Sequence, residues 1–139
     1  MTNVNVTKSI NVSANEAWSN LASFRGIEKI SPIAKSIVEG EGEGSKRTCI
    51  MPDGAEIKEV LSKLDNDKML LEYKIISGPF PITNYVSTVL VTPINVNNCE
   101  VSWSCNFNTE ASAEQDMKDL FNGFYNVIIE GLEKLIKEN

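Results

Sequence analysis

Apolar positions recur at every second residue near the N-terminus, at Val4, Val6, Ile10 and Val12, with polar residues between them. This period is typical of a β-strand that buries one face and leaves the other in solvent. The stretch has no charged region followed by an apolar block, so it does not resemble a signal peptide. We therefore predict that the chain begins with a strand.

Two short helical segments are predicted after this strand. In "SANEAWSNLASF", Ser13 stands three residues before Glu16, which is the spacing of a capping box at a helix start. Alanine, tryptophan and leucine then recur on one face of that helix. Gly26 and Pro32 bracket a second, briefer helical turn.

The middle of the chain predicts six more strands, in the segments "KSIV", "SKRTCIM", "EIKEVLSKL", "MLLEYKII", "TNYVSTVLV" and "CEVSWSCNF". Glycine, proline, aspartate and asparagine separate them, as expected of an antiparallel meander. The glycine-rich stretch from Gly40 to Gly44 is followed by a strand and carries three glutamates nearby, whereas a phosphate-binding loop leads into a helix. We interpret it as a hairpin turn whose glycines adopt positive φ.

The C-terminal segment changes to helical periodicity. Gly123 and Gly131 interrupt it, each costing about 1 kcal/mol relative to alanine, and mark either close packing or a bend. A long amphipathic helix is predicted from its apolar positions, which are Met117, Leu120, Phe121, Phe124, Ile128, Leu132 and Leu135.

This order of elements, with "INVSANEAWSNLASF", "GSKRTCIMPDGAEIKEVLSKLDND", "LLEYKIISGPFPITNYVSTVLVTP" and "VSWSCNF", resembles the START-related superfamily. That superfamily (SRPBCC) includes the polyketide cyclase/dehydrase-like and birch-pollen-allergen-like proteins. The resemblance implies an α+β helix-grip fold, in which a curved antiparallel sheet of about seven strands wraps around a long C-terminal helix. It also implies one ligand-binding domain over residues 1–139, with an apolar pocket between sheet and helix. None of these segments is a catalytic signature.

Composition and charge exclude several classes of function. The formal charge of −6 argues against nucleic acid as a partner, and no apolar run is long enough for stable membrane insertion. The absence of histidine excludes Ser-His and Cys-His catalysis and histidine metal ligands. Three cysteines without C-x-x-C spacing suggest neither a disulfide framework nor a zinc site, so we expect a cytoplasmic protein without metal or cofactor. A monomer or homodimer is expected.

The predicted inward faces combine aromatic residues with a few hydroxyls, which is the composition of a small-molecule site. A plain hydrophobic core is the alternative for each of these residues. With the resemblance, the candidate ligand-binding residues are Ile57, Glu59, Tyr73, Ile75, Phe80, Tyr85, Ser87, Trp103, Cys105, Phe107, Phe121, Phe124, Tyr125 and Ile128.

Glu59 is the most specific single candidate for a functional residue, because it alternates with the apolar Ile57 and Leu61. If that face is buried, a carboxylate without a partner would have a raised pKa and could transfer protons or anchor a ligand. The alternative places Glu59 on the solvent face beside Glu56 and Lys58. "KEVLSKLD" and "TNYVS" resemble segments of the abscisic-acid receptors that face the hormone cavity.

Two connections, "MPDGA" and "SGPFPI", occupy positions that resemble those of the receptors' gate and latch loops. They lack the receptors' Ser-Gly-Leu-Pro and Gly-Gly-x-His-Arg motifs, so a hormone receptor is not expected. The prolines around Phe80 favour a rigid turn with an exposed aromatic ring, and a closing lid is the alternative.

Three functions follow as hypotheses. The first is binding of a small hydrophobic or aromatic molecule, or a lipid, in a cavity of about 300 Å3 or more. The second is a cyclase or dehydratase in which Glu59 acts as acid or base and Tyr73 or Tyr85 orients a carbonyl. The third is a chaperone-associated or assembly protein without a ligand.

Overall fold

The computed structural model describes residues 1–138, which form seven strands, two α-helices and a 3-10 turn. In chain order the elements are β1 (Thr2–Ile10), α1 (Ala14–Ala22), η1 (Ile27–Lys29), β2 (Lys35–Glu39), β3 (Lys46–Ile50), β4 (Glu56–Asp65), β5 (Leu70–Ser77), β6 (Thr83–Asn95), β7 (Asn98–Asn108) and α2 (Ala111–Lys137).

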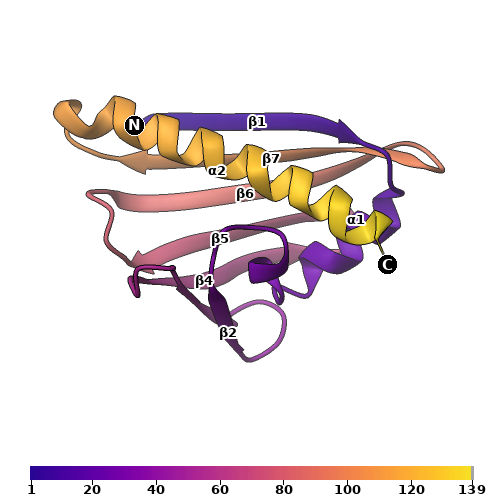
Figure 1. Cartoon of the computed structure of the whole chain (residues 1–139), viewed down its shortest axis with the longest axis horizontal. Coiled ribbons are helices and arrows are strands. Elements are labelled where there is room, and N and C mark those ends of the chain that lie inside the picture. Colours follow the sequence, from indigo (N-terminus) through magenta and orange to yellow (C-terminus); the bar gives the residue numbers. More distant parts are fainter. Residues whose placement is uncertain (139) are drawn as a thin grey trace.

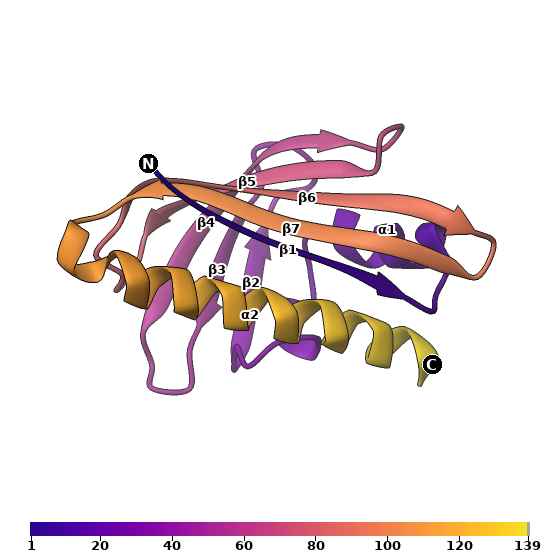
Figure 2. The same cartoon turned by 90° about the horizontal axis from the view of Figure 1, so that it is seen from above.

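All seven strands form one antiparallel sheet in the order β1-β7-β6-β5-β4-β3-β2. The sheet is strongly twisted, and α2 runs along its inner face (Figures 1 and 2). The predicted helix-grip fold is therefore confirmed. The long strands β6 and β7 follow the direction of α2, whereas β2, β3 and β4 cross it steeply (Figure 2).

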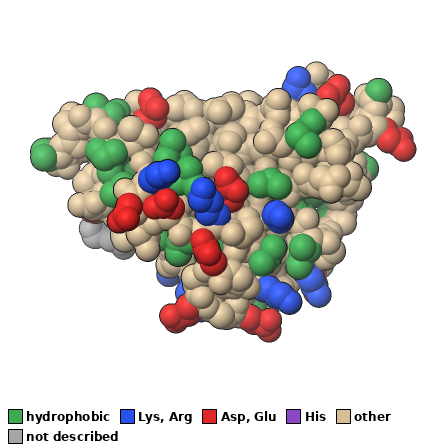
Figure 3. Space-filling view, turned by 180° about the vertical axis from the view of Figure 1, so that it is seen from behind, with side chains coloured by type: hydrophobic (Ala, Val, Ile, Leu, Met, Phe, Trp, Pro, Cys, Tyr) green, Lys and Arg blue, Asp and Glu red, His purple; other side chains and the backbone are tan. Residues whose placement is uncertain are grey.

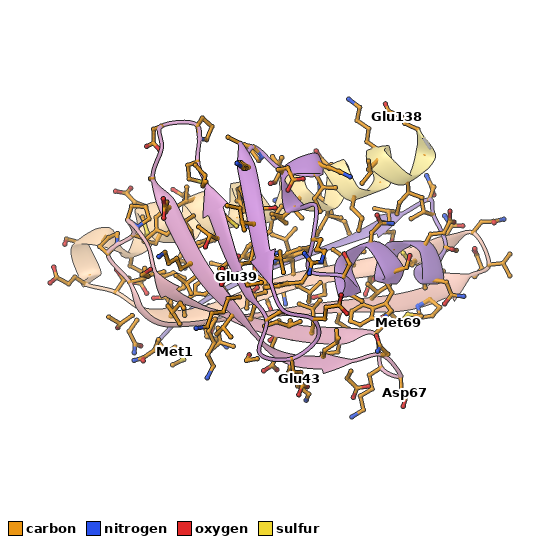
Figure 4. All side chains as sticks on the ribbon, turned by 90° about the horizontal axis from the view of Figure 1, so that it is seen from below. Met1, Glu39, Glu43, Asp67, Met69 and Glu138 are labelled. Carbon is orange, nitrogen blue, oxygen red and sulfur yellow. The ribbon has the colours of Figure 1, made fainter. Side chains whose placement is uncertain are left out.

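Local sequence signals explain the short elements. The capping box at α1 is present, because the Ser13 hydroxyl accepts the Glu16 amide at 3.1 Å. In the β2–β3 connection, Gly40, Gly42 and Gly44 all have positive φ, as the hairpin interpretation requires. Figure 4 shows Glu43 in this connection, well away from Glu138 at the end of α2.

The long helix begins at Ala111, six positions before the first apolar residue of the predicted stripe. Its first turns are polar, so hydrophobic periodicity could not detect them. A Cβ at Gly123 would have no neighbour within 4 Å, whereas a Cβ at Gly131 would lie 2.2 Å from the carbonyl oxygen of Ile30. Gly131 thus marks close packing of α2 against the residue that ends η1.

One core cluster lies between the sheet and the two helices α1 and α2. It includes Val101 and Phe107 of β7 and Ile129 and Leu132 of α2, all fully buried. The face of the molecule that points away from the viewer in Figure 1 carries acidic and basic side chains close together (Figure 3). Within residues 1–138, neither helix combines the length and apolar character that crossing a membrane requires.

Candidate functional site

An apolar pocket lies between the curved sheet and the middle of α2. Its volume is about 100 Å3, so the expectation of about 300 Å3 or more is wrong for this conformation. The inner faces of β3, β4, β5 and β6 form one wall, α2 forms another, and three residues from the connections complete the lining. The lining residues are Ile33, Cys49, Met51, Ile57, Glu59, Tyr73, Ile75, Phe80, Tyr85, Leu120, Phe121, Phe124 and Tyr125.

The predicted candidates divide into two groups. Those that line the pocket are Ile57, Glu59, Tyr73, Ile75, Phe80, Tyr85, Phe121, Phe124 and Tyr125. Those that do not line it are Ser87, Trp103, Cys105, Phe107 and Ile128, which are buried in the solid core. Sequence reasoning missed the lining residues Ile33, Cys49, Met51 and Leu120.

Packing explains why the second group is withdrawn from the pocket. The Ser87 hydroxyl donates to the carbonyl oxygen of Ser104 at 2.8 Å, so its polar group is engaged with the neighbouring strand. The Trp103 indole N–H donates to the Tyr73 hydroxyl at 3.1 Å. These residues support the pocket wall from behind.

Glu59 is buried with a partner, which corrects the expectation of an unpaired carboxylate. Arg47 Nε donates to Glu59 Oε1 at 2.6 Å, and the Cys49 thiol reaches the same oxygen at 3.4 Å. β3 and β4 place Arg47 directly opposite Glu59 in the antiparallel register. Because Glu59 is 7% exposed and Arg47 is 5% exposed, this is a buried ion pair rather than a surface one.

Aromatic rings hold the guanidinium in place. The Arg47 Cζ lies 3.9 Å from the Phe24 ring centroid and 5.2 Å from that of Tyr73, both within cation–π range. Burial alone would lower the pKa of Arg47, but Glu59, Cys49 and Tyr73 outweigh it and the pKa is raised. Arg47 is therefore a fixed cation, and sequence reasoning did not identify it.

The other ionisable groups of the pocket are neutral near pH 7. Burial, with the nearby Glu59 charge, raises the pKa of both Cys49 and Tyr73 to about 12. Burial also raises the pKa of Tyr85 and Tyr125 well above the usual phenol value, and their hydroxyls bond to each other. Cys49 is thus a poor nucleophile. Among residues 1–138, no group of three acidic or thiol side chains could hold a metal ion.

The pocket mouth is formed by side chains from three segments. Phe80, from the β5–β6 connection, packs edge-on against Phe121 with 5.7 Å between ring centroids. Phe80 is half-buried, so the expectation of an exposed ring is wrong. Met51, from the β3–β4 connection, and Leu120 of α2 also line the pocket, and Leu120 is 41% exposed. The two loops singled out from sequence therefore meet α2 around one opening.

A larger hollow of about 330 Å3 lies elsewhere, between α1, η1 and the end of α2. Its lining is mixed and includes Ser19, Asn20 and Lys29. Arg25 also lines it, but the guanidinium donates to the carbonyls of Val38 and Gly40. The smaller pocket has the more apolar and more enclosed lining, so it is the candidate ligand site.

A twisted antiparallel sheet that wraps around a long C-terminal helix defines the helix-grip fold. Residues 1–138 match the family model described as "Polyketide cyclase / dehydrase and lipid transport". The chain belongs to this family.

Solved structures agree on the fold. The chain is similar to XoxI from Bacillus cereus, with 27% identity, coverage of 98% of this chain and 96% of that chain, and a TM-score of 0.88. An uncharacterized protein from Bacillus thuringiensis is 26% identical. The match covers 97% of this chain and 98% of that chain, with a TM-score of 0.87. Norcoclaurine synthase from Thalictrum flavum, solved in complex with dopamine and hydroxybenzaldehyde, is 18% identical. The match covers 99% of this chain and 87% of that chain, with a TM-score of 0.83. At that identity the likeness concerns the fold alone.

One curated protein also shows local sequence similarity. It is a component of the glutamyl-tRNA(Gln) amidotransferase of Oceanobacillus iheyensis, and it is 31% identical over 71% of this chain. The match spans 28% of the length of that protein.

Proposed function

We propose that this protein binds a small apolar molecule, preferably an aromatic one, in the pocket between the sheet and α2. The observation that carries the proposal is an enclosed pocket whose walls are aliphatic and aromatic, with Glu59 as its one charged lining residue. Membership of a family that includes lipid transport supports the same ligand class. Aromatic walls suit a flat ring, because offset and edge-on ring contacts add to the gain from burial.

The volume limits the ligand that enters without rearrangement. A cavity of about 150 Å3 accommodates benzene in an engineered protein. The present pocket, at about 100 Å3, suits one small ring after minor side-chain shifts. Phe80 and Leu120 at the mouth are the groups whose movement would admit a longer molecule such as a lipid chain, because neither is fully buried.

The enzyme hypothesis receives less support from the geometry. Oε1 of Glu59 is engaged by Arg47 and Cys49, so only Oε2 is left to act on a substrate. The Tyr73 hydroxyl accepts from Trp103, and the Tyr85 and Tyr125 hydroxyls bond to each other. The assembly-protein hypothesis stays a prediction that pull-down experiments can test.

Toluene binding tests the proposal with a matched pair of variants. Ile75 lines the pocket, while its neighbour Ile76 is 57% exposed. Isothermal titration calorimetry should detect toluene binding to the unaltered chain. Ile75→Phe should weaken it at least tenfold by filling the pocket, and Ile76→Phe should leave it unchanged. Equal effects of the two substitutions would contradict binding at this site.

Native mass spectrometry of protein purified from its own host would identify a retained ligand and the oligomeric state together. We propose a monomer or homodimer in the cytoplasm. The three cysteines of the described chain, Cys49, Cys99 and Cys105, are all free and buried, which suits a reducing compartment.

A further inference from the structure

The two carboxylate oxygens of Glu59 are in different situations. Both hydrogen bonds that Glu59 accepts from described residues, from Arg47 and Cys49, end on Oε1. No fully buried side-chain nitrogen or oxygen in the described chain lacks a partner, so Oε2 must retain some accessible surface. Because Glu59 is 93% buried and lines the pocket, that surface faces the pocket.

The charge of this carboxylate is already balanced. Arg47 contacts it at 2.6 Å and is itself held over the Phe24 ring. A cationic ligand would leave one positive charge in excess inside an apolar pocket, and an anionic ligand would meet the bare face of Glu59. A neutral ligand avoids both penalties. Oε2 can only accept a hydrogen bond when ionised, so the ligand must donate.

We propose, building on the ligand-binding function above, that this pocket selects a neutral aromatic molecule that carries an O–H or N–H donor. The ring lies against the aromatic wall formed by Tyr73, Tyr85 and Phe121, and its donor bonds to Glu59 Oε2. Phenols, anilines and indoles have this chemistry. The ion pair of Glu59 with Arg47 contributes no net charge to the site.

Toluene and phenol are matched probes, since a methyl group replaces a hydroxyl on one ring. In the unaltered chain phenol should bind more tightly than toluene, although toluene is the more apolar compound. Benzylamine, as a cation, should bind more weakly than phenol. Calorimetric titrations of the three compounds measure these affinities directly. The proposal would be overturned if toluene or benzylamine bound more tightly than phenol.

A double variant removes the acceptor without leaving an unpaired charge. Arg47→Met with Glu59→Leu replaces the ion pair by apolar side chains of similar size, a change that buried pairs often tolerate. The ratio of phenol affinity to toluene affinity should fall by about tenfold or more, as expected for a hydrogen bond to a charged group. An unchanged ratio would refute the role of Oε2 in selecting the ligand, but it would not refute the binding function itself. Failure of both probes to bind the unaltered chain would instead refute the binding function itself.

Discussion

Replacing Glu59 with glutamine removes one charge from a pair whose members are 7% and 5% exposed. Arg47 would remain a cation, because guanidinium groups do not lose their proton in proteins. Its remaining contacts are the Phe24 and Tyr73 rings and a 3.5 Å approach to the Phe24 carbonyl oxygen. These do not replace a carboxylate.

Breaking one side of a buried ion pair typically costs about 3–5 kcal/mol. We expect Glu59→Gln to lose about 3 kcal/mol, near the lower end, because the amide oxygen can still accept from Arg47 Nε. Arg47→Met should lose a similar amount, since it leaves the carboxylate unpaired. The double variant Arg47→Met with Glu59→Leu should lie within about 1 kcal/mol of the unaltered chain or exceed its stability.

Urea denaturation followed by circular dichroism measures all of these variants. With a slope typical of small proteins, a loss of about 3 kcal/mol lowers the midpoint by about 1.5–2 M. The reasoning would be refuted if each single substitution cost under about 1 kcal/mol, or if the double variant lost the sum of the two, because distant, independent residues behave additively.

Gly123→Ala should raise the free energy of unfolding by up to about 1 kcal/mol through helix propensity, whereas Gly131→Ala should lower it by about 1–2 kcal/mol, because its methyl group would meet the Ile30 backbone. Thermal midpoints that rank the two in the opposite order would contradict the packing of α2. Phe80→Ala should widen the pocket mouth and admit naphthalene; calorimetry showing no gain in naphthalene binding would argue against Phe80 as the gate. Alkali should lower stability between about pH 9 and 12, because an unfolded thiol and phenol ionise near 9.0 and 10.0 while Cys49 and Tyr73 keep their protons to about 12. The folded state then binds more protons in that window, so urea midpoints should fall as pH rises, and fall less steeply in Tyr73→Phe.

Alternation along the strands was sufficient to predict which side chains point inward. Tyr85 and Trp103 are both buried as expected. Alternation does not show which strands of the sheet border the pocket. Tyr85 of β6 lines the pocket, whereas no residue of β7, Trp103 included, does so. The packing of α2, which is a tertiary property, sets the difference.

Arg47 was missed because a charged residue in a Lys-Arg pair looks like surface. A signal was present, however. Arg47 and Glu59 stand at equal distances of six positions from Asp53, so a hairpin centred there would place them opposite each other, as the register confirms. Pairing the two strands about their turn would have predicted an inward cation beside the inward acid.

The central claim is that a ligand occupies the pocket between the sheet and α2. The most direct measurement is a methyl NMR titration with phenol that follows Ile57 and Ile75, which line the pocket, against Ile94 and Val127, which are exposed. We predict saturable shifts and ligand contacts at Ile57 and Ile75, with none at the exposed pair. Shifts confined to the exposed methyls, or none at any concentration, would contradict the claim.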